Sequence, residues 1–352
     1  MTDISPFLKS LLSAPGLTGH ESPVARLIEE RWRTLADEVS LSRLGSVHAL
    51  MRGSAAAPRP SLLISAHMDA IGLMVAGISG EFLRLSALGG IDARVLPGAP
   101  VLVHGRKPLP GIIVQPPARL LPESSADEVI GLEHLLVDVG LTAAQAARQV
   151  RVGDLVSFAN EPVELSGETL SGHSIDNRVS VAALTLCLEA LQAGVHAWDV
   201  WAVAAVQEEL TFAGGVTSAF TLRPSLAVVV DTTFGKGPGA SGWDAFPIGK
   251  GLTLGIGPSI HPFLHAKFKE LAERLEIPVA VEPMPTFSGT EADGLQVAAQ
   301  GVPTMVLSIP IRYMHTPVEV VAIKDIQRAG RLLAEFAAGL EEDFLEKVVW
   351  DD

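Results

Sequence analysis

The sequence predicts an α/β fold in which a mixed central sheet is flanked by helices and interrupted by an inserted β-rich segment. Near-continuous apolar runs at 200–206 and 226–230 are typical of strands covered on both faces. Apolar residues at helical spacing precede these strands over 176–193 and follow them over 263–275. Between 70 and 164, short apolar runs are broken by Gly and Pro, which is typical of a small β domain.

The elements before the insertion are two helices and a strand. Ser5-Pro6 and Ser22-Pro23 each resemble an N-cap followed by proline at the first helical position. The apolar run 62–66 predicts a buried strand.

The β-rich segment and the second α/β part follow in order. Inside the segment we expect one helix, at 143–150, and strands at 72–76, 82–85, 101–103, 111–114 and 155–158. After the segment we expect helices at 176–193, 263–275 and from 323 through Leu340 to Phe344, and strands at 200–206, 226–230, 279–281 and 304–308.

Two domains account for these elements. At about 150 residues per domain, 352 residues correspond to roughly two. We expect residues 1–69 plus 165–352 to form one α/β domain, and residues 70–164 to form a second, inserted domain.

Composition excludes several classes of protein. With 48% hydrophobic and 19% charged residues, the chain is not disordered, and the scarcity of charge suggests surfaces buried in a homo-oligomer. Lys and Arg number 26 against 40 Asp and Glu, a net charge of −14, so no nucleic acid and no anionic membrane surface is expected as a partner. The single cysteine, Cys187, permits neither an intramolecular disulfide nor a cysteine-based zinc site.

No apolar run of about 18 residues predicts a membrane span, and the first twelve residues lack a basic start followed by an apolar run. The expected location is the cytoplasm.

Polar residues that could carry chemistry follow the predicted strands. In open α/β sheets, ligands bind outside the carboxyl ends of the strands. His67 follows one strand, with Asp69 two residues on as a candidate partner for its second ring nitrogen. Glu208 and Glu209 follow a second strand, and Asp231 ends a third. Carboxylates at the ends of core strands are costly unless they are paired or bind metal.

Two further residues complete the set. Asp176 opens a helix, where it acts either as an ordinary N-cap or as a carboxylate shared by two cations. His315 follows the strand at 304–308 by several residues. His67, Asp176, Glu209, Asp231 and His315 together offer the donors that two zinc-like ions require, which leaves Glu208 free to act as a general base.

Six phrases resemble the di-zinc aminopeptidases of the glutamyl/tetrahedral family: AHMDAIGLMV, GHSIDNRV, QEELTFAGG, VVVDTT, FSGTEADG and RYMHTPVEVV. They occur in the family's order and spacing, and with the earlier phrase PGLTGHES the resemblance spans roughly residues 15–325. The resemblance implies an α/β catalytic domain interrupted by a β-rich domain that makes dimer contacts. It also implies assembly into hollow tetrahedral dodecamers.

The resemblance also implies roles for the candidate residues. One metal would be held by His67, Asp176 and Asp231, and the other by Asp176, Glu209 and His315. Glu208 would be the general base, and Asp69 would orient His67. We expect two divalent ions per subunit, zinc first and cobalt or manganese as alternatives, and peptides as substrates.

Three other functions agree less well with these residues. A related di-zinc hydrolase of another amide, such as an N-acyl amino acid, needs a basic clamp that Arg178 and Arg312 could supply. A non-catalytic scaffold is disfavoured because every proposed ligand and the base are present. A glycosidase needs two carboxyls about 5–9.5 Å apart across a sugar ring, which the adjacent Glu208 and Glu209 would supply poorly.

Overall fold

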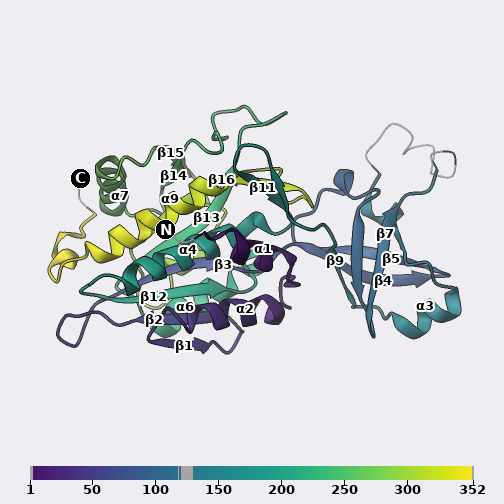
Figure 1. The fold of residues 1–352 in the computed structure, drawn as a ribbon, viewed down its shortest axis with the longest axis horizontal. Helices are drawn as coiled ribbons and strands as arrows, with labels where there is room; N and C mark the ends of the chain where they lie inside the picture. The colour runs from purple at the N-terminus through teal and green to yellow at the C-terminus, as the bar shows by residue number, and fades with distance from the viewer. Residues whose placement is uncertain (1–2, 118, 120–129, 351–352) are drawn as a thin grey trace.

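The computed structural model of the protein describes residues 3–117, 119 and 130–350, so the remaining positions of the predicted domain ranges lie outside the described residues. It contains two sheets side by side, each with its own apolar core (Figure 1). The larger sheet has eleven strands, and the smaller one is a closed barrel. The predicted mixed α/β fold with a β-rich insertion is therefore confirmed.

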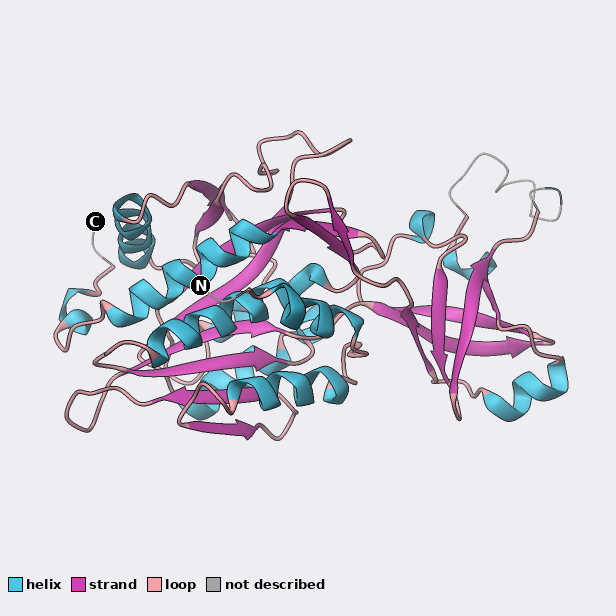
Figure 2. Ribbon diagram, viewed as in Figure 1, coloured by secondary structure: helices cyan, strands magenta, loops and turns pink. Residues whose placement is uncertain are grey.

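Four parallel strands form the centre of the large sheet. They are β12 (Asp199–Ala205), β3 (Ser61–His67), β13 (Leu226–Phe234) and β16 (Thr304–Arg312), in that order. Nearly all of their residues are buried, because helices cover the sheet on both faces. In Figure 2, α4 (Ile175–Gln192) lies in front of these strands and α6 (Ala213–Leu222) behind them.

Antiparallel strands at both edges make the sheet mixed. β2 (Val47–Met51) and β1 (Glu38–Leu41) extend it beyond β12. On the other side, β17 (Glu319–Ala322), β11 (Thr169–Gly172) and β10 (Val163–Leu165) follow β16. None of these five short strands was predicted from the sequence.

The sheet forks at β16. Its middle pairs with β14 (Leu252–Ile256), so that Ser308 lies opposite Thr253, whereas its end pairs with β17. β15 (Val279–Pro283) runs parallel to β14 on the outer side. The fork opens the sheet beside the strand ends, where the cavity described below lies.

The remaining helices of this part are mostly short. They are α1 (Ser5–Ser13), α2 (Ser22–Trp32), α5 (Glu208–Thr211), α7 (Pro262–Arg274), α8 (Ala292–Leu295) and α9 (Ile323–Ala338). Both N-terminal helices were predicted, but the N-caps were wrong. The cap positions are Ile4 and Glu21, so each serine is already inside its helix. α9 ends before Leu340 and Phe344, with Gly339 at its C-cap.

The small sheet is a six-stranded barrel. Its strands are β4 (Gly72–Ser79), β5 (Phe82–Leu88), β8 (Leu136–Asp138), β7 (Pro108–Val114), β6 (Pro100–His104) and β9 (Leu155–Phe158), in that order around the barrel. Inward residues such as Leu73, Val101 and Val137 are fully or almost fully buried. Closure leaves no free strand edge, and α3 (Ala143–Gln149) packs beside it.

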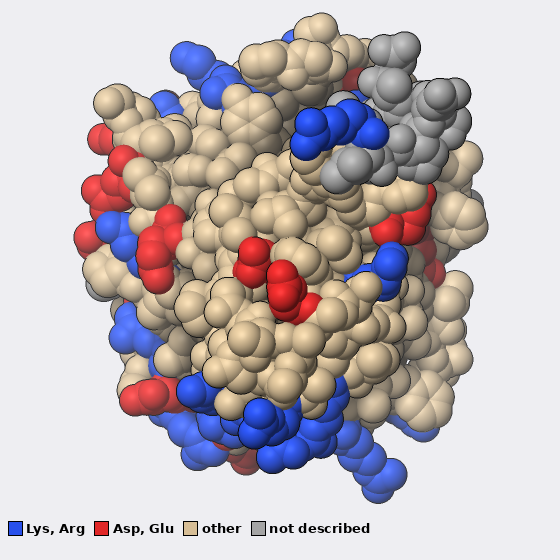
Figure 3. Space-filling model, turned by 90° about the vertical axis from the view of Figure 1, so that its right-hand side faces the viewer, with Lys and Arg blue, Asp and Glu red and all other residues tan. Residues whose placement is uncertain are grey.

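Figure 3 shows the barrel end of the molecule, where Lys and Arg gather at the lower edge below a mostly uncharged centre. Arg106, Lys107, Arg148 and Arg151 are exposed in this part of the chain. The backbone N–H of Arg106 donates to the carbonyl of Gln149, which brings the two segments together. No basic patch was apparent in the sequence because these residues are separated by about forty positions.

No helix in the described part of the chain is both long and apolar enough to cross a membrane.

Candidate metal centre

The carboxyl ends of the parallel strands meet at one edge of the sheet and line a cavity of about 430 Å³. Its lining includes the six residues that the sequence singled out as ligands or base: His67, Asp176, Glu208, Glu209, Asp231 and His315. Asp69, the seventh, lies fully buried behind His67. Segments more than 240 residues apart in the chain thus meet at one place.

His67 is the most enclosed imidazole of the cavity, with its side chain only 2% exposed. Its Nε2 lies 3.4 Å from Oδ1 of Asp176. The same nitrogen lies 3.7 Å from both Oε2 of Glu208 and Oδ1 of Asp231. Burial disfavours the charged ring, but these carboxylates raise the pKa of His67 well above its usual value.

Asp69 supports two parts of the site at once. Its Oδ1 lies 3.4 Å from Nδ1 of His67, the arrangement expected for a residue that orients this ring. Its two carboxylate oxygens also accept hydrogen bonds from the backbone N–H groups of Glu208 and Glu209, at 3.0 and 3.2 Å. Sequence reasoning did not anticipate this second role, which ties the end of β3 to the start of α5.

Glu208 and Glu209 begin a single helical turn directly after a left-handed residue, Gln207. Both carboxyl groups are buried, and burial raises the pKa of Glu208 to about 10 and that of Glu209 to about 8. Oε1 of Glu209 has no hydrogen-bond partner among the described residues. Carboxylates held in this way are costly without a cation, so this donor set fits divalent metal ions.

Asp176 lies between the two histidines. Its Oδ1 faces His67, and its Oδ2 lies 3.4 Å from Nε2 of His315. Burial alone would raise its pKa, but hydrogen bonds with His315 and His67 hold the pKa of Asp176 well below its usual range. Oγ1 of Thr232 donates to Oδ1 at 2.9 Å. The side chain points into the cavity, so the interpretation of Asp176 as an ordinary N-cap is not supported.

His315 reaches the cavity from the loop between β16 and β17. Its backbone has a positive φ of 62°, and Tyr313 has one of 59°, values that are uncommon for residues other than glycine. Its Nε2 lies 3.4 Å from Oε2 of Glu209. The hydrogen bond with Asp176 raises the pKa of His315 to about 9.

Glu319 is a site residue that was not predicted from the sequence. It is 1% exposed, and its two oxygens accept the backbone N–H groups of His315 (2.9 Å) and Asp176 (3.1 Å). It thereby fixes the loop of one histidine to the start of α4. The signal in the sequence was an acid surrounded by valines, Val318-Glu319-Val320-Val321.

The cavity contains two groups of donor atoms that lie within 4.8 Å of one another. One consists of His67, Glu208 and Asp231, and the other of His67, Asp176 and Glu209. In the first group Glu208, which was expected to be a base, lies as close to His67 and Asp231 as a further metal ligand would.

The proposed clamp for an N-acyl amino acid does not form. Arg178 is 1% exposed, and its guanidinium donates to backbone carbonyls of Leu11, Ala14, Gly16 and Met68. Arg312 donates to the carbonyl of Lys236. Among the described residues, none of those lining the cavity is Lys or Arg, so a substrate carboxylate has no cation to bind there.

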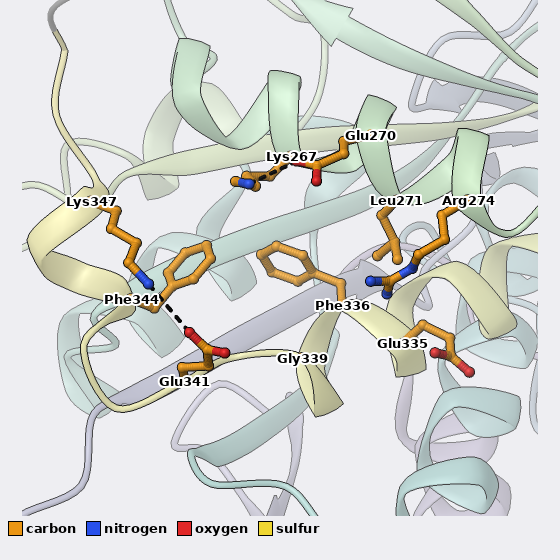
Figure 4. A pocket seen from close by; sticks show the side chains of 10 residues that line it. All are labelled: Lys267, Glu270, Leu271, Arg274, Glu335, Phe336, Gly339, Glu341, Phe344 and Lys347. Carbon is orange, nitrogen blue, oxygen red and sulfur yellow. Dashed lines mark hydrogen bonds and ion pairs between the residues drawn. The ribbon is translucent and has the colours of Figure 1, made fainter.

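A second cavity, of about 270 Å³, lies between α7, α9 and the 3₁₀ helix Phe344–Lys347 (Figure 4). Phe336 and Phe344 form part of its wall, and Lys267 pairs with Glu270 at 2.7 Å. Its described lining contains no histidine and none of the candidate donor groups. The strand-end cavity is therefore the candidate metal centre.

An α/β sheet with parallel central strands, beside whose carboxyl ends two imidazoles and buried carboxylates surround a cavity, is typical of metal-dependent hydrolases. A model of the M42 glutamyl aminopeptidase family matches residues 45–332. The chain therefore belongs to this family. The predicted metallo-aminopeptidase function is confirmed, and the alternative hydrolase of N-acyl amino acids is not favoured.

Individual relatives agree with this assignment. A lysyl aminopeptidase of Pyrococcus furiosus is 34% identical over 331 residues, which cover 92% of this chain and 94% of the relative. The solved structure of a TET aminopeptidase from a marine sediment Thaumarchaeota archaeon is 28% identical, with a TM-score of 0.92, and covers 98% and 99% of the two chains.

The Pyrococcus horikoshii TET1 peptidase is 27% identical, with a TM-score of 0.81, over 96% of this chain and 100% of that one. That relative can assemble into a tetrahedron or a large octahedral shell.

Proposed function

We propose that the chain removes N-terminal residues from peptides with two divalent ions, zinc first and cobalt or manganese as alternatives. His67, Asp176 and Asp231 would hold one ion, and Asp176, Glu209 and His315 the other. The observation that carries this proposal is the position of Asp176, whose two oxygens each lie 3.4 Å from a different imidazole. Such a carboxylate is suited to bridging two ions.

In this proposal the ions would polarise a water molecule and the substrate carbonyl. Glu208 lies within the cavity and accepts the proton of the attacking water, then donates it to the leaving amine. Bound cations would favour the ionised form of Glu208, which is the form that accepts a proton. Asp69 keeps His67 oriented from behind.

The test begins with the chelator-treated protein, reloaded with zinc, cobalt or manganese. Elemental analysis should find two ions per subunit, and aminoacyl reporter substrates should be hydrolysed only after reloading. N-acetylated peptides should resist, because their terminal amine is blocked. Cleavage of N-acetylated peptides at internal bonds would exclude an aminopeptidase.

We further propose a homo-oligomer in which the barrel, within residues 70–164, pairs subunits into dimers that build a hollow dodecamer. The assemblies described for the TET1 relative support it. Val95, Ile112 and Val152 expose apolar side chains on the barrel, as an interface requires. Light scattering should give a mass of twelve subunits, and a fully active monomer would rule out the shell.

A closed particle would admit short unfolded peptides and exclude folded proteins. Digestion of peptides of increasing length, beside a folded protein with a structured N-terminus, tests this consequence. A cytoplasmic location completes the proposal, and cell fractionation tests it.

A further inference from the structure

The cavity is lined by further residues besides the candidate metal ligands and base. Apolar side chains of Leu210, Phe212, Phe234, Met284 and Met314 form part of its wall. Polar groups of Thr233, Glu282, Ser288, Thr290 and Ser308 form another part of it. This second set is what a substrate side chain would meet next to the metal centre.

One row of side chains connects the metal centre to these residues. Asp231 on β13 is the register partner of Ser308 on β16, and Ser308 is the partner of Thr253 on β14. Partners in neighbouring strands point to the same face of a sheet. Two strand spacings therefore separate Asp231 from Thr253, a distance of about 10 Å.

Glu282 lies at the far end of this row. Its Oε2 accepts a hydrogen bond from Oγ1 of Thr253, and its Oε1 accepts one from Oγ1 of Thr233, both at 2.5 Å. Each oxygen of a carboxylate can accept more than one hydrogen bond, so capacity remains. The two hydroxyls fix the carboxylate in place without neutralising it.

The charge of Glu282 has no cation to balance it in the cavity. The lining contains no Lys or Arg in the part of the chain that the structure describes. Burial raises the pKa of the Glu282 carboxyl, and hydroxyl donors offset this only in part. It is also the one carboxylate of the described cavity lining outside the proposed ligands and base.

Ser308 lies beside Glu282 and also lines the cavity. Its side chain is 1% exposed, and its hydroxyl faces the Glu282 carboxylate closely enough to lower the pKa of that group, but its Oγ makes no hydrogen bond of normal geometry among the described residues. A buried hydroxyl without a well-aligned partner is costly. A ligand with several N–H donors at this position would satisfy both Ser308 and Glu282.

We infer that Glu282 and Ser308 form the end of the pocket for the substrate's N-terminal side chain and select lysine and arginine. This inference rests on the proposed aminopeptidase function. An extended lysine spans about 6 Å from Cα to Nζ. With a contact distance added at each end, this length matches the row of about 10 Å between Asp231 and Thr253. Its methylenes pack on apolar wall residues such as Met284. Glutamate and aspartate are excluded by like charge.

The first test compares aminoacyl reporters of lysine, arginine, leucine and glutamate. Wild-type protein should give a kcat/KM for lysine and arginine above that for leucine, with glutamate far below. Glu282→Gln should lower the lysine-to-leucine ratio by about 10- to 100-fold, the loss expected for one charged hydrogen bond. Glu273→Gln, on the exposed surface of α7, should leave the ratio unchanged.

The second test needs no variant, so it holds even if Glu282→Gln does not fold. Free L-lysine and L-norleucine differ in one ammonium group and serve as product inhibitors of leucine-reporter hydrolysis. Lysine should inhibit at least about 10-fold more strongly, and equal inhibition would overturn the inference. If the leucine and glutamate reporters are cleaved with the same kcat/KM as the lysine reporter, the inference is wrong but the proposed function stands. If no reporter is cleaved, the proposed function fails.

Discussion

The two histidines of the metal centre are held in different ways. His67 ends β3 in the middle of the sheet, with a side chain 2% exposed and Asp69 behind its second nitrogen. His315 lies on a loop, 38% exposed, with a left-handed backbone. One half of the site is thus built by the sheet, whereas the other half depends on a loop that Glu319 fixes.

This contrast shows how rigidity is distributed over the site. Ligands on buried strands are preorganised by packing, while a loop ligand must be ordered before or during binding. We therefore expect the ion at His67 to bind more tightly than the ion at His315. The predictions below test this expectation, from the largest effect to the smallest.

The largest effect is expected for Asp176→Ala, which removes the carboxylate shared by both halves. Both ions should be lost and activity should fall to background. Elemental analysis after desalting checks the count, with the exposed Asp244→Ala as the matched control. If Asp176→Ala retains two ions, Asp176 is not a bridging ligand.

Glu208→Gln should keep both ions but lower kcat by about 10²- to 10⁴-fold, since a general base is lost. The measurement is kcat in protein whose metal content has been verified. Because Glu208 also lies within ligand distance of His67 and Asp231, loss of one ion would instead make Glu208 a ligand.

His315→Ala should lose one ion and keep the other, which isolates the loop half. His67→Ala should lose the other ion and also destabilise the metal-free fold by about 2–5 kcal/mol, because it leaves buried carboxylates without a partner. For His315→Ala the loss should stay below about 1 kcal/mol, since this side chain is partly exposed. Urea unfolding of both metal-free variants checks this, and equal losses would contradict the contrast.

The loop half should also respond to pH. The pKa of His315 in the metal-free fold is about 9, above the value of about 6.5 in an unfolded chain. Its contribution to stability is therefore complete below about pH 6.5 and is lost as the pH rises through 9. The difference in Tm between metal-free wild type and His315→Ala should shrink over this interval. Metal affinity should rise over the same interval, because the ligand must be neutral.

The smallest effect is expected for Glu319→Gln. An amide has one acceptor oxygen, so one of the two backbone N–H groups, of His315 or Asp176, loses its partner. We expect the ion at His315 to bind about 10-fold more weakly, with the affinity of the ion at His67 unchanged. A cobalt titration followed by absorption measures both affinities. An equal loss at both halves would show that Glu319 supports the whole site.

The candidate residues could be identified from sequence because most of them follow apolar strands. Glu208, Glu209 and Asp231 are acids where a core strand ends, which is a chemical anomaly in itself. Glu319 could not be recognised in this way, because its function is to accept backbone hydrogen bonds from segments about 140 residues apart. The second role of Asp69 was missed for the same reason.

The long apolar strands of the large sheet could be predicted, whereas its short strands could not. β12 and β13 have seven and nine residues, whereas β1, β2 and β17 have only four or five. These short strands of the large sheet carry few residues for a pattern and form because a neighbouring strand offers hydrogen bonds. α9 ends at Ala338, with Gly339 at its C-cap, although apolar spacing continues to Phe344. Apolar spacing alone does not show where a helix ends, so the prediction ran past the cap.

The buried guanidinium of Arg178 has a consequence for the order of folding. It binds carbonyls of Leu11, Ala14 and Gly16, so the first segment of the chain lacks its partner until residue 178 has been synthesised. The barrel, complete by Phe158 and with its own core, has no such dependence. During N-to-C synthesis the barrel can therefore close before the N-terminal segment has its partner. The α/β part of the chain, which is synthesised first, then completes its folding after the barrel.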